Sequence, residues 1–112
     1  MPEGSVPRPD ILAAIPIPPE IRDDMIDMIT NSAGTVWQRP AIPPAQRSMM
    51  TISILGTVGR LEELKTHIGM GLDNGLSRTE ICEVIMHLGV YAGMPAASAA
   101  FRVASAVFAE RD

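Results

Sequence analysis

ICEVIMHLGVYAGMP, the sequence of residues 81–95, predicts a helix that is apolar over most of its surface. Within it, Glu83, His87 and Tyr91 follow one another at i, i+4 spacing, which places their side chains on one face. Because the other faces carry Ile, Val, Met and Leu, we expect the helix to be buried nearly all round. A buried row of ionisable groups indicates either a structural hydrogen-bonded set or a reaction centre. The spacing taken alone favours the structural interpretation.

Segments before and after this helix carry the periodic apolar pattern of further helices. Ser77-Arg78-Thr79-Glu80 has the form of a capping box at the start of the central helix, so we assign Glu80 to structure. Gly75 is a natural cap for the helix before it, and Pro95 separates the central helix from the last one. The four further predicted helices run from Glu20 to about Ser32, from Pro43 to Gly56 or Gly59, from Leu61 to about Asn74, and from Ala96 to about Glu110.

Two segments outside these helices are predicted to be irregular. Trp37 to Pro44 reads as a connector. Residues 1–19 hold six of the ten prolines and predict an extended arm ahead of a helical domain, residues 20–112. Since this arm also carries branched apolar side chains, we expect it to lie on the body of the protein or across a neighbouring subunit.

The composition fits a small helical protein. A chain of 112 residues is long enough for one domain with a single core. Hydrophobic residues make up 46% of the chain and aromatic residues only 4%, so Ala, Ile, Leu, Val and Met must fill that core. These residues suit packed helices better than sheets. We therefore predict an all-α fold, a compact bundle of about five helices with an extended Pro-rich N-terminal arm.

Charge and cysteine content exclude several classes of protein. The formal net charge of -4, with Lys and Arg scattered along the chain, leaves no basic patch for nucleic acid or for an anionic membrane surface. Cys82 is the single cysteine, which rules out a disulfide or a Cys-x-x-Cys pair within the chain and favours a reducing cytoplasm. No signal peptide and no run of about 20 apolar residues is present, so we expect a soluble cytoplasmic protein.

Three short motifs carry a resemblance to a known family. They are RLEELKTH at residues 60–67, GLSRTEICE at residues 75–83 and YAGMPAA at residues 91–97, with His87 between the last two. Together they closely resemble the carboxymuconolactone decarboxylase family, whose members share an all-helical fold with the alkyl hydroperoxidase D-like proteins. The resemblance extends to WQRP at residues 37–40, QRS at residues 46–48 and FAE at residues 108–110, roughly the last two-thirds of the chain. It implies a trimer or hexamer and a role in the breakdown of aromatic compounds.

The reaction that the resemblance implies is loss of carbon dioxide from a small carboxylated lactone without a cofactor. Electrons released with carbon dioxide pass through a conjugated double bond into the lactone carbonyl, so the protein has to position the substrate and deliver a proton. An imidazole that titrates near neutrality suits this task, which makes His67 and His87 the candidates. His67 lies at the margin of the apolar stripe of its helix and matches the family motif, so it is the first choice.

Other residues are assigned supporting roles. Glu83 would orient a histidine ring or carry protons to it, and Tyr91 would donate a hydrogen bond to a developing enolate oxygen. Arg39 and Arg47 match the family just before and at the start of the second predicted helix and would bind substrate carboxylates, while Trp37 would form a wall of the pocket. A surface guanidinium or a subunit contact explains these last three residues equally well.

Alternatives remain open at this stage. Family members most similar to the decarboxylases often have Gln in place of His87 and Cys in place of Ala92, which supports a helical oligomer that binds a ligand or assembles without catalysis. A peroxidase of the alkyl hydroperoxidase type needs a second thiol that the chain lacks. A metal site built from His67, Glu83 and His87 is a weak signal, and the resemblance implies no metal. Each alternative keeps the expectation of a homo-oligomer, because so apolar a set of helices should expose faces that need partners.

Overall fold

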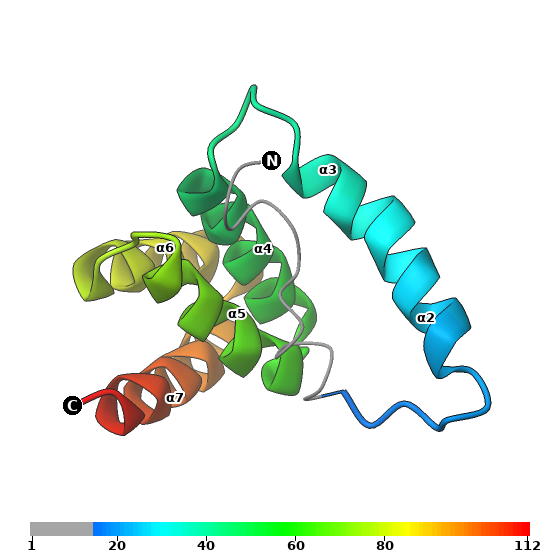
Figure 1. The fold of residues 1–112 in the computed structure, drawn as a ribbon. Helices are drawn as coiled ribbons and strands as arrows, with labels where there is room; N and C mark the ends of the chain where they lie inside the picture. The colour runs from blue at the N-terminus through cyan, green and yellow to red at the C-terminus, as the bar shows by residue number, and fades with distance from the viewer. Residues whose placement is uncertain (1–14) are drawn as a thin grey trace. The chain divides into compact units, whose positions relative to one another are not determined.

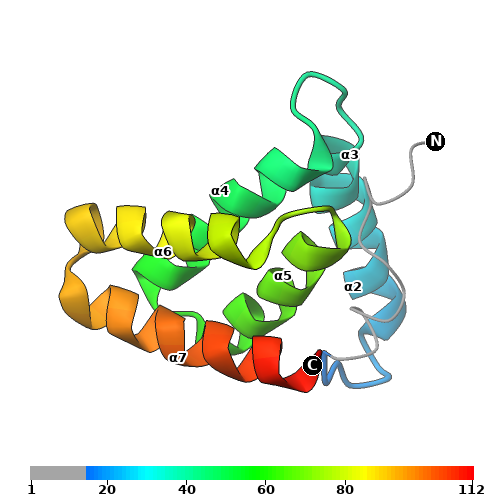
Figure 2. The same ribbon diagram turned by 90° about the vertical axis from the view of Figure 1, so that its left-hand side faces the viewer.

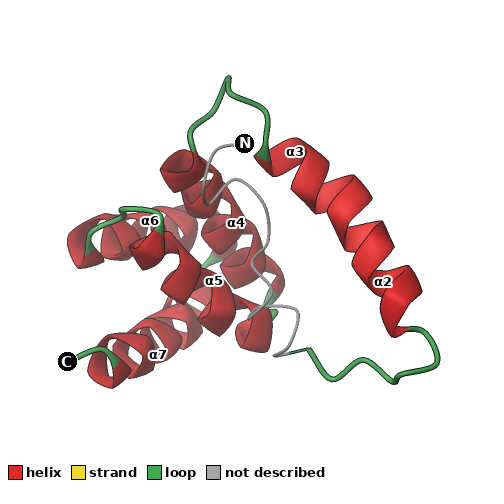
Figure 3. Cartoon of the chain, in the orientation of Figure 1, coloured by secondary structure: helices red, strands yellow, loops and turns green. Residues whose placement is uncertain are grey.

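A computed structural model of the chain describes residues 15–112, and all regular structure in that part is helical (Figure 1). Helices and loops alternate from residue 15 to residue 112 with no strand among them (Figure 3). The predicted all-α class is therefore confirmed. Most of the predicted arm falls on residues 1–14, which lie outside the described residues, and residues 15–19 hold no helix. Between residues 15 and 112, no helix combines the length and the apolar character that a membrane crossing requires.

Contacts divide the chain into an N-terminal unit that ends at Pro44 and a C-terminal unit, Ala45–Asp112. In the N-terminal unit, α2 (Arg22–Ile29), the π-helical segment η1 (Thr30–Gly34) and α3 (Thr35–Trp37) follow one another without a break. The predicted helix of this region therefore continues for one turn more than expected, and the placement of Trp37 in a connector is wrong.

Two hydroxyl side chains of this helical run donate hydrogen bonds to carbonyls one turn earlier. The Ser32 hydroxyl donates to the carbonyl of Met28 at 2.6 Å, and the Thr35 hydroxyl donates to the carbonyl of Asn31 at 3.1 Å. Ser, Thr and Asn are residues that commonly end helices, because their side chains compete for backbone groups. Here the two hydroxyls bond back to carbonyls of the preceding turn and do not compete for backbone N–H groups, and such bonds often accompany a local departure from α-helical geometry.

The C-terminal unit begins with the helices α4 (Pro44–Val58) and α5 (Leu61–Asp73). Gly59 ends α4 and not Gly56, and its φ of 77° is a conformation that other residues rarely adopt. Gly75, with a φ of 104°, takes the same role after α5, as the sequence predicted. The helix α6 (Arg78–Ala92) then starts at a complete capping box, in which Ser77 and Glu80 satisfy each other's backbone N–H groups. The assignment of Glu80 to structure is confirmed.

The last helix, α7 (Met94–Glu110), begins directly after Gly93 and returns beside α6 as its antiparallel neighbour (Figure 2). It starts two residues earlier than predicted, because Pro95 falls in its first turn, where proline fits without loss of a hydrogen bond. Small side chains bring the two helices together: a Cβ added to Gly89 would lie 3.0 Å from the Cβ of Ala97. The Ala-rich face of α7 therefore serves close helix packing, as its composition predicted.

The core of the C-terminal unit is a single apolar cluster with contributions from all four helices. Two glycines allow α4 to approach its neighbours closely. A Cβ added to Gly56 would lie 2.8 Å from Leu88 Cδ2, and one added to Gly71 would lie 3.2 Å from Ile52 Cδ1. Both distances are shorter than ordinary contacts between carbon atoms. The buried members of the cluster are Ile52, Leu64, Ile68, Leu76, Ile81, Ile85, Leu88, Ala97, Ala100, Ala104 and Val107.

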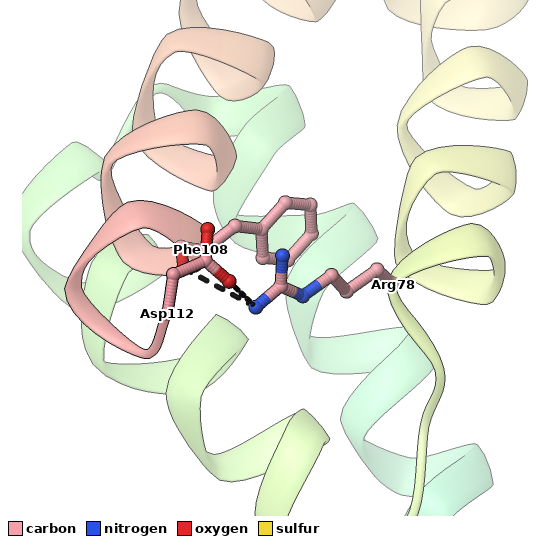
Figure 4. Close-up of polar contacts among 3 residues, drawn as sticks. All are labelled: Arg78, Phe108 and Asp112. Carbon is pink, nitrogen blue, oxygen red and sulfur yellow. Dashed lines mark hydrogen bonds and ion pairs between the residues drawn. The ribbon is translucent and has the colours of Figure 1, made fainter.

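Polar contacts fix the ends of these helices around the core. The Asn74 amide donates to the hydroxyl of buried Ser48 at 3.0 Å and joins the end of α5 to the start of α4. The Arg78 guanidinium lies over the Phe108 ring, donates to the Phe108 carbonyl and pairs with Asp112, so the start of α6 is joined to the end of α7 (Figure 4). Arg111 in turn donates to the Asp73 carboxylate and to the Gly69 carbonyl of α5. Three elements thus meet at the last turn of α7.

The helix α6 is not buried all round, which corrects the first expectation drawn from its sequence. Only Ile81, Ile85 and Leu88 are buried, on the side that faces the core. Val90 is 77% exposed and Tyr91 81% exposed, and Glu83 and His87 are exposed as well. The apolar sequence of α6 does not show how much of its surface other helices cover. In a single chain of this size, the neighbouring helices cover only one stripe of α6.

The capping box of α6 predicts the effect of a single substitution. Replacing Ser77 with Ala removes the hydroxyl that accepts from the Glu80 N–H, and we expect the free energy of unfolding to fall by about 1 kcal/mol. Urea denaturation followed by far-UV circular dichroism measures the change. Ser105→Ala, at an exposed position within α7, is the matched control and should leave stability unchanged or slightly raised. Equal effects of the two substitutions would contradict the role of the cap.

The space around two glycines, Gly56 of α4 and Gly69 of α5, predicts different effects on stability when each is replaced with Ala. Gly56→Ala forces a methyl group against the buried Leu88 side chain, and we expect a loss of roughly 1–3 kcal/mol from overpacking, partly offset by better helix propensity. Gly69→Ala in α5 meets only the end of the Arg111 side chain, which can move, so we expect a stability equal to or above that of the wild type. Thermal unfolding of both variants checks the difference in sign.

Candidate active site

His67 lies in the middle of α5 and is half-buried, in agreement with its predicted place at the margin of the apolar stripe. Its neighbours in the sequence, Leu64 and Ile68, are fully buried and hold this side of α5 against the core. The ring nitrogen Nδ1 is buried and makes no hydrogen bond to any residue between 15 and 112. Buried polar atoms in folded proteins nearly always have a partner, so this nitrogen calls for an explanation.

Two opposing effects act on the imidazole of His67. Burial lowers its pKa below the usual value of 6.5, because a charged ring is less well solvated there than in water. The carboxylate of Glu63, one helical turn earlier on α5, opposes this shift, since its negative charge favours the protonated ring. Burial is the larger effect, so His67 is a weaker base and, once protonated, a stronger acid than a histidine in water.

Glu83, His87 and Tyr91 share one face of α6, as their spacing predicted, but that face is exposed. The rings of His87 and Tyr91 lie 5.2 Å apart between centroids, at an angle of 42°. No hydrogen bond, ion pair or ring contact among the described residues joins any of the three to His67. The row is therefore a surface feature of the C-terminal unit.

His87 also lines a shallow apolar hollow between α4 and α6. The hollow has a volume of about 210 Å³, and its other lining residues are Met49, Met50, Ser53 and Val84. An imidazole beside thioether and aliphatic groups offers one polar contact in an otherwise apolar surface, and the hollow is smaller than the roughly 300–1,000 Å³ of typical ligand pockets. His87 was predicted from the sequence as a site residue, whereas the α4 residues opposite it were not. Their spacing along α4 gave no signal, because methionines on a helix are most often core residues.

The three residues assigned to substrate binding differ in their settings. Arg47 lies in the first turn of α4 and is buried, with 9% of its surface exposed. Arg39 is exposed in the loop after α3, and half-buried Trp37 is the last residue of α3, so both belong to the N-terminal unit. Arg47 thus has the protected position that a carboxylate-binding guanidinium needs, while the binding roles of all three residues stay predictions.

The structure also bears on the thiol of Cys82 and on the predicted metal site. Cys82 is half-buried on α6 and is a free thiol. Within residues 15–112, no group of three or more His, Cys, Asp or Glu side chains is arranged to hold a metal ion. The weak metal signal from His67, Glu83 and His87 therefore finds no support in the positions of these residues. The sequence analysis also missed Glu63, although its i, i+4 spacing to His67 was readable from the RLEELKTH motif.

Three known proteins and one protein family are similar in sequence to this chain. The chain is 39% identical over 90 residues to 4-carboxymuconolactone decarboxylase of Acinetobacter baylyi, a match that covers 80% of this chain and 67% of that protein. It is 39% identical over 70 residues to nitrosuccinic acid decarboxylase of Metarhizium robertsii, over 62% of this chain and 49% of that protein. A 15.0 kDa uncharacterized protein of Paracoccus denitrificans is 30% identical over 105 residues, 92% of this chain and 76% of that protein.

The family profile matches a continuous region that includes both histidines. The profile of the carboxymuconolactone decarboxylase family aligns with residues 24–106, from α2 to the last turns of α7. This region contains each of the seven candidate site residues. The extent of that match, together with the similarity to the Acinetobacter protein, shows that this chain belongs to the carboxymuconolactone decarboxylase family.

Proposed function

We propose that this protein is a cofactor-independent decarboxylase of a small carboxylated lactone or a related small acid, with His67 as the principal proton carrier. The supporting observation is the half-buried imidazole whose Nδ1 makes no hydrogen bond among the described residues. A related lyase or isomerase step on such an acid would use the same groups. The two relatives named as decarboxylases support a carboxy-lyase, and their names point to small acids as substrates.

The proposed reaction needs one proton for each carbon dioxide released. The bond between the carboxylate carbon and the ring carbon breaks, and its electron pair passes through the conjugated double bond to the lactone carbonyl oxygen. A proton from the His67 imidazolium then reaches carbon, so hydrogen replaces the carboxylate in the product. The imidazole regains its proton from solvent. Burial makes the protonated ring a stronger proton donor, and it also lowers the fraction of rings that carry the proton.

The other candidates have supporting roles in this proposal. Arg47 binds a substrate carboxylate through its buried guanidinium, while Arg39 and Trp37 of the N-terminal unit stay candidates for substrate binding. Glu83, His87 and Tyr91 form a second polar group, in which Tyr91 donates to the enolate oxygen and Glu83 orients His87 or carries protons to it. Since this row is exposed in a single chain, it functions in the reaction only where another surface covers it.

The exposed apolar side chains of α4, of α6 and of the start of α7 support the second candidate, a non-catalytic helical oligomer that binds a ligand or assembles. Ile54 is 60% exposed, and Met86, Val90 and Met94 are exposed beyond half of their surface. Exposed apolar side chains of this size leave water when a second subunit covers them. We propose homo-oligomerisation under either function, with a trimer or a hexamer as the arrangement that the family resemblance implies.

Replacing His67 tests the proposed decarboxylase. Release of carbon dioxide from 4-carboxymuconolactone and from nitrosuccinic acid is measured for the wild type, His67→Ala and His87→Ala. We expect His67→Ala to lower kcat by roughly 10²- to 10⁴-fold, the range for loss of a general acid, and His87→Ala to lower it less. Circular dichroism verifies that each variant is folded. A wild type without turnover of either acid would favour the non-catalytic oligomer, and a fully active His67→Ala would remove His67 as the proton carrier.

The lowered pKa of His67 predicts a pH dependence of stability. Well above pH 6.5 the ring is neutral in both folded and unfolded chains and contributes nothing to the difference. As the pH falls through 6.5, the unfolded chain takes up a proton before the folded protein does, so stability is lost until the folded pKa is passed. His67→Gln removes this loss. We expect this variant to lose less stability than the wild type between about pH 7.5 and about pH 5, by urea denaturation.

The carboxylates of the protein contribute their own pH dependence, which wild type and variant share. The difference between the two is therefore the quantity of interest. His87→Gln, measured in parallel, gives the contribution of the other histidine. If wild type and His67→Gln lose equal stability on acidification, the imidazole of His67 is not held in an environment that disfavours its charge.

A further inference from the structure

We infer that Asn74 is a positioning residue for Arg47, because its amide fixes the start of α4 on the face of α5 that carries His67. This inference rests on the proposed role of Arg47 as the group that binds a substrate carboxylate. Asn74 does not touch the substrate in this role. It acts through the buried hydroxyl of Ser48, the residue that follows Arg47 in the sequence. None of the roles assigned above includes it.

A hydrogen bond to a fully buried hydroxyl joins the end of α5 to the start of α4. The Asn74 amide Nδ2 donates to Ser48 Oγ at 3.0 Å, across 26 positions of the sequence. Ser48 has no surface exposed to solvent, so removal of the amide would leave its oxygen without this donor and without water in its place. The contact is therefore a strong constraint on where the start of α4 lies.

The same contact places the start of α4 along the His67 face of α5. Gly71 and Asn74 follow His67 at i+4 and i+7, so the three residues lie on one face of the helix and its cap. Ser48 meets this face twice. Its hydroxyl bonds to Asn74, and its Cβ would lie 3.6 Å from a Cβ added to Gly71. The start of α4, which includes Arg47, is thus held alongside the two turns of α5 that follow the proposed proton carrier.

Arg47 belongs to the same rigid turn as this contact point. It precedes Ser48 in a regular helix, and its carbonyl also accepts from the Thr51 hydroxyl at 2.9 Å. The guanidinium Nε of Arg47 is shielded from water, and the residue as a whole is buried. Because a buried guanidinium has little room to adjust, a small displacement of its helical turn changes where it meets a carboxylate. The Asn74 amide therefore helps to set the position of Arg47 relative to His67.

The adjacent Asp73 makes a similar link in another direction and provides the matched control. Its carboxylate pairs with Arg111 at 3.0 Å and joins the end of α5 to the end of α7. Asp73→Ala and Asn74→Ala each remove one polar link from the same turn, but only the link of Asn74 leads to α4. General loosening of the end of α5 should therefore appear in both variants, whereas loss of Arg47 positioning should appear only in Asn74→Ala.

The first test follows the Arg47 side chain by NMR in the whole chain. Its Nε–Hε signal is assigned by its loss in Arg47→Gln. Because Nε is shielded from water, we expect this hydrogen to exchange slowly in the wild type and about tenfold faster or more in Asn74→Ala. Asp73→Ala should keep the exchange rate of the wild type. An unchanged rate in Asn74→Ala, or equal acceleration in the two variants, would overturn the inference whatever the activity of the protein.

Activity provides the second test, with 4-carboxymuconolactone and nitrosuccinic acid as substrates. We expect Asn74→Ala to raise KM about tenfold and to change kcat less than about threefold, since Arg47 holds the substrate both before and during the reaction. When Asn74→Ala is added to Arg47→Gln, KM should rise less than about twofold, because the two residues act as one unit. Asp73→Ala should leave KM unchanged. Circular dichroism verifies that each variant is folded.

Failure of the inference and failure of the proposed function are distinguishable. A wild type without turnover rejects the proposed function, and the exchange rate of the Arg47 hydrogen then decides whether Asn74 positions that side chain. If Arg47→Gln raises KM and Asn74→Ala does not, only the positioning role is rejected. Equal increases in KM from Asn74→Ala with and without Arg47 would also overturn it. An unchanged KM in Arg47→Gln removes the carboxylate-binding role of Arg47 and the inference with it.

Discussion

The close approach of helices through small residues is the constraint on which the C-terminal unit depends. Gly56 brings α4 against Leu88 of α6, and Gly71 lets Ile52 of α4 reach the backbone of α5. Alanines on α7 allow the same closeness to α6. With few aromatic side chains available, the chain fills its core by short distances between helices and not by large groups. The fold therefore depends more on the absence of a side chain at these glycines than on any single contact between large side chains.

This packing also determines the setting of the candidate site. Because one side of α5 is held against the core by Leu64 and Ile68, a residue at the edge of that side is neither fully buried nor fully exposed. His67 occupies that edge, and its lowered pKa follows from the position of the helix. Glu63 lies one turn further toward solvent on the same face. Exposure to solvent differs between neighbouring turns of α5. The imidazole of His67 and the carboxylate of Glu63 therefore have different surroundings although both lie on one regular helix.

The sequence predicted the parts of this structure that depend on local signals. The capping box at Ser77, the cap at Gly75 and the edge position of His67 were all readable, because each depends on residues within a turn or two. The surroundings of α6 were not readable. Val90 and Tyr91 are residue types that are often buried, but both are exposed. Their exposure depends on how many helices of one chain can pack around α6. The α4 side of the hollow beside His87 was missed for the same reason, since it requires the packing of two distant segments.

The π-helical segment η1 changes the direction in which later side chains of the helical run between Arg22 and Trp37 point. A π-helical turn contains about one residue more than an α-helical turn, so it advances the sequence by one position relative to the helix surface. Side chains after Gly34 are therefore rotated by about 100° from the direction that a regular α-helix would give them. Loss of one residue from η1 would restore α-helical geometry and turn Trp37 to another side, with no other change in the chain. The direction of Trp37 is thus set by the length of the segment that precedes α3, and relatives that differ there by one residue would present a different surface at the same aligned position.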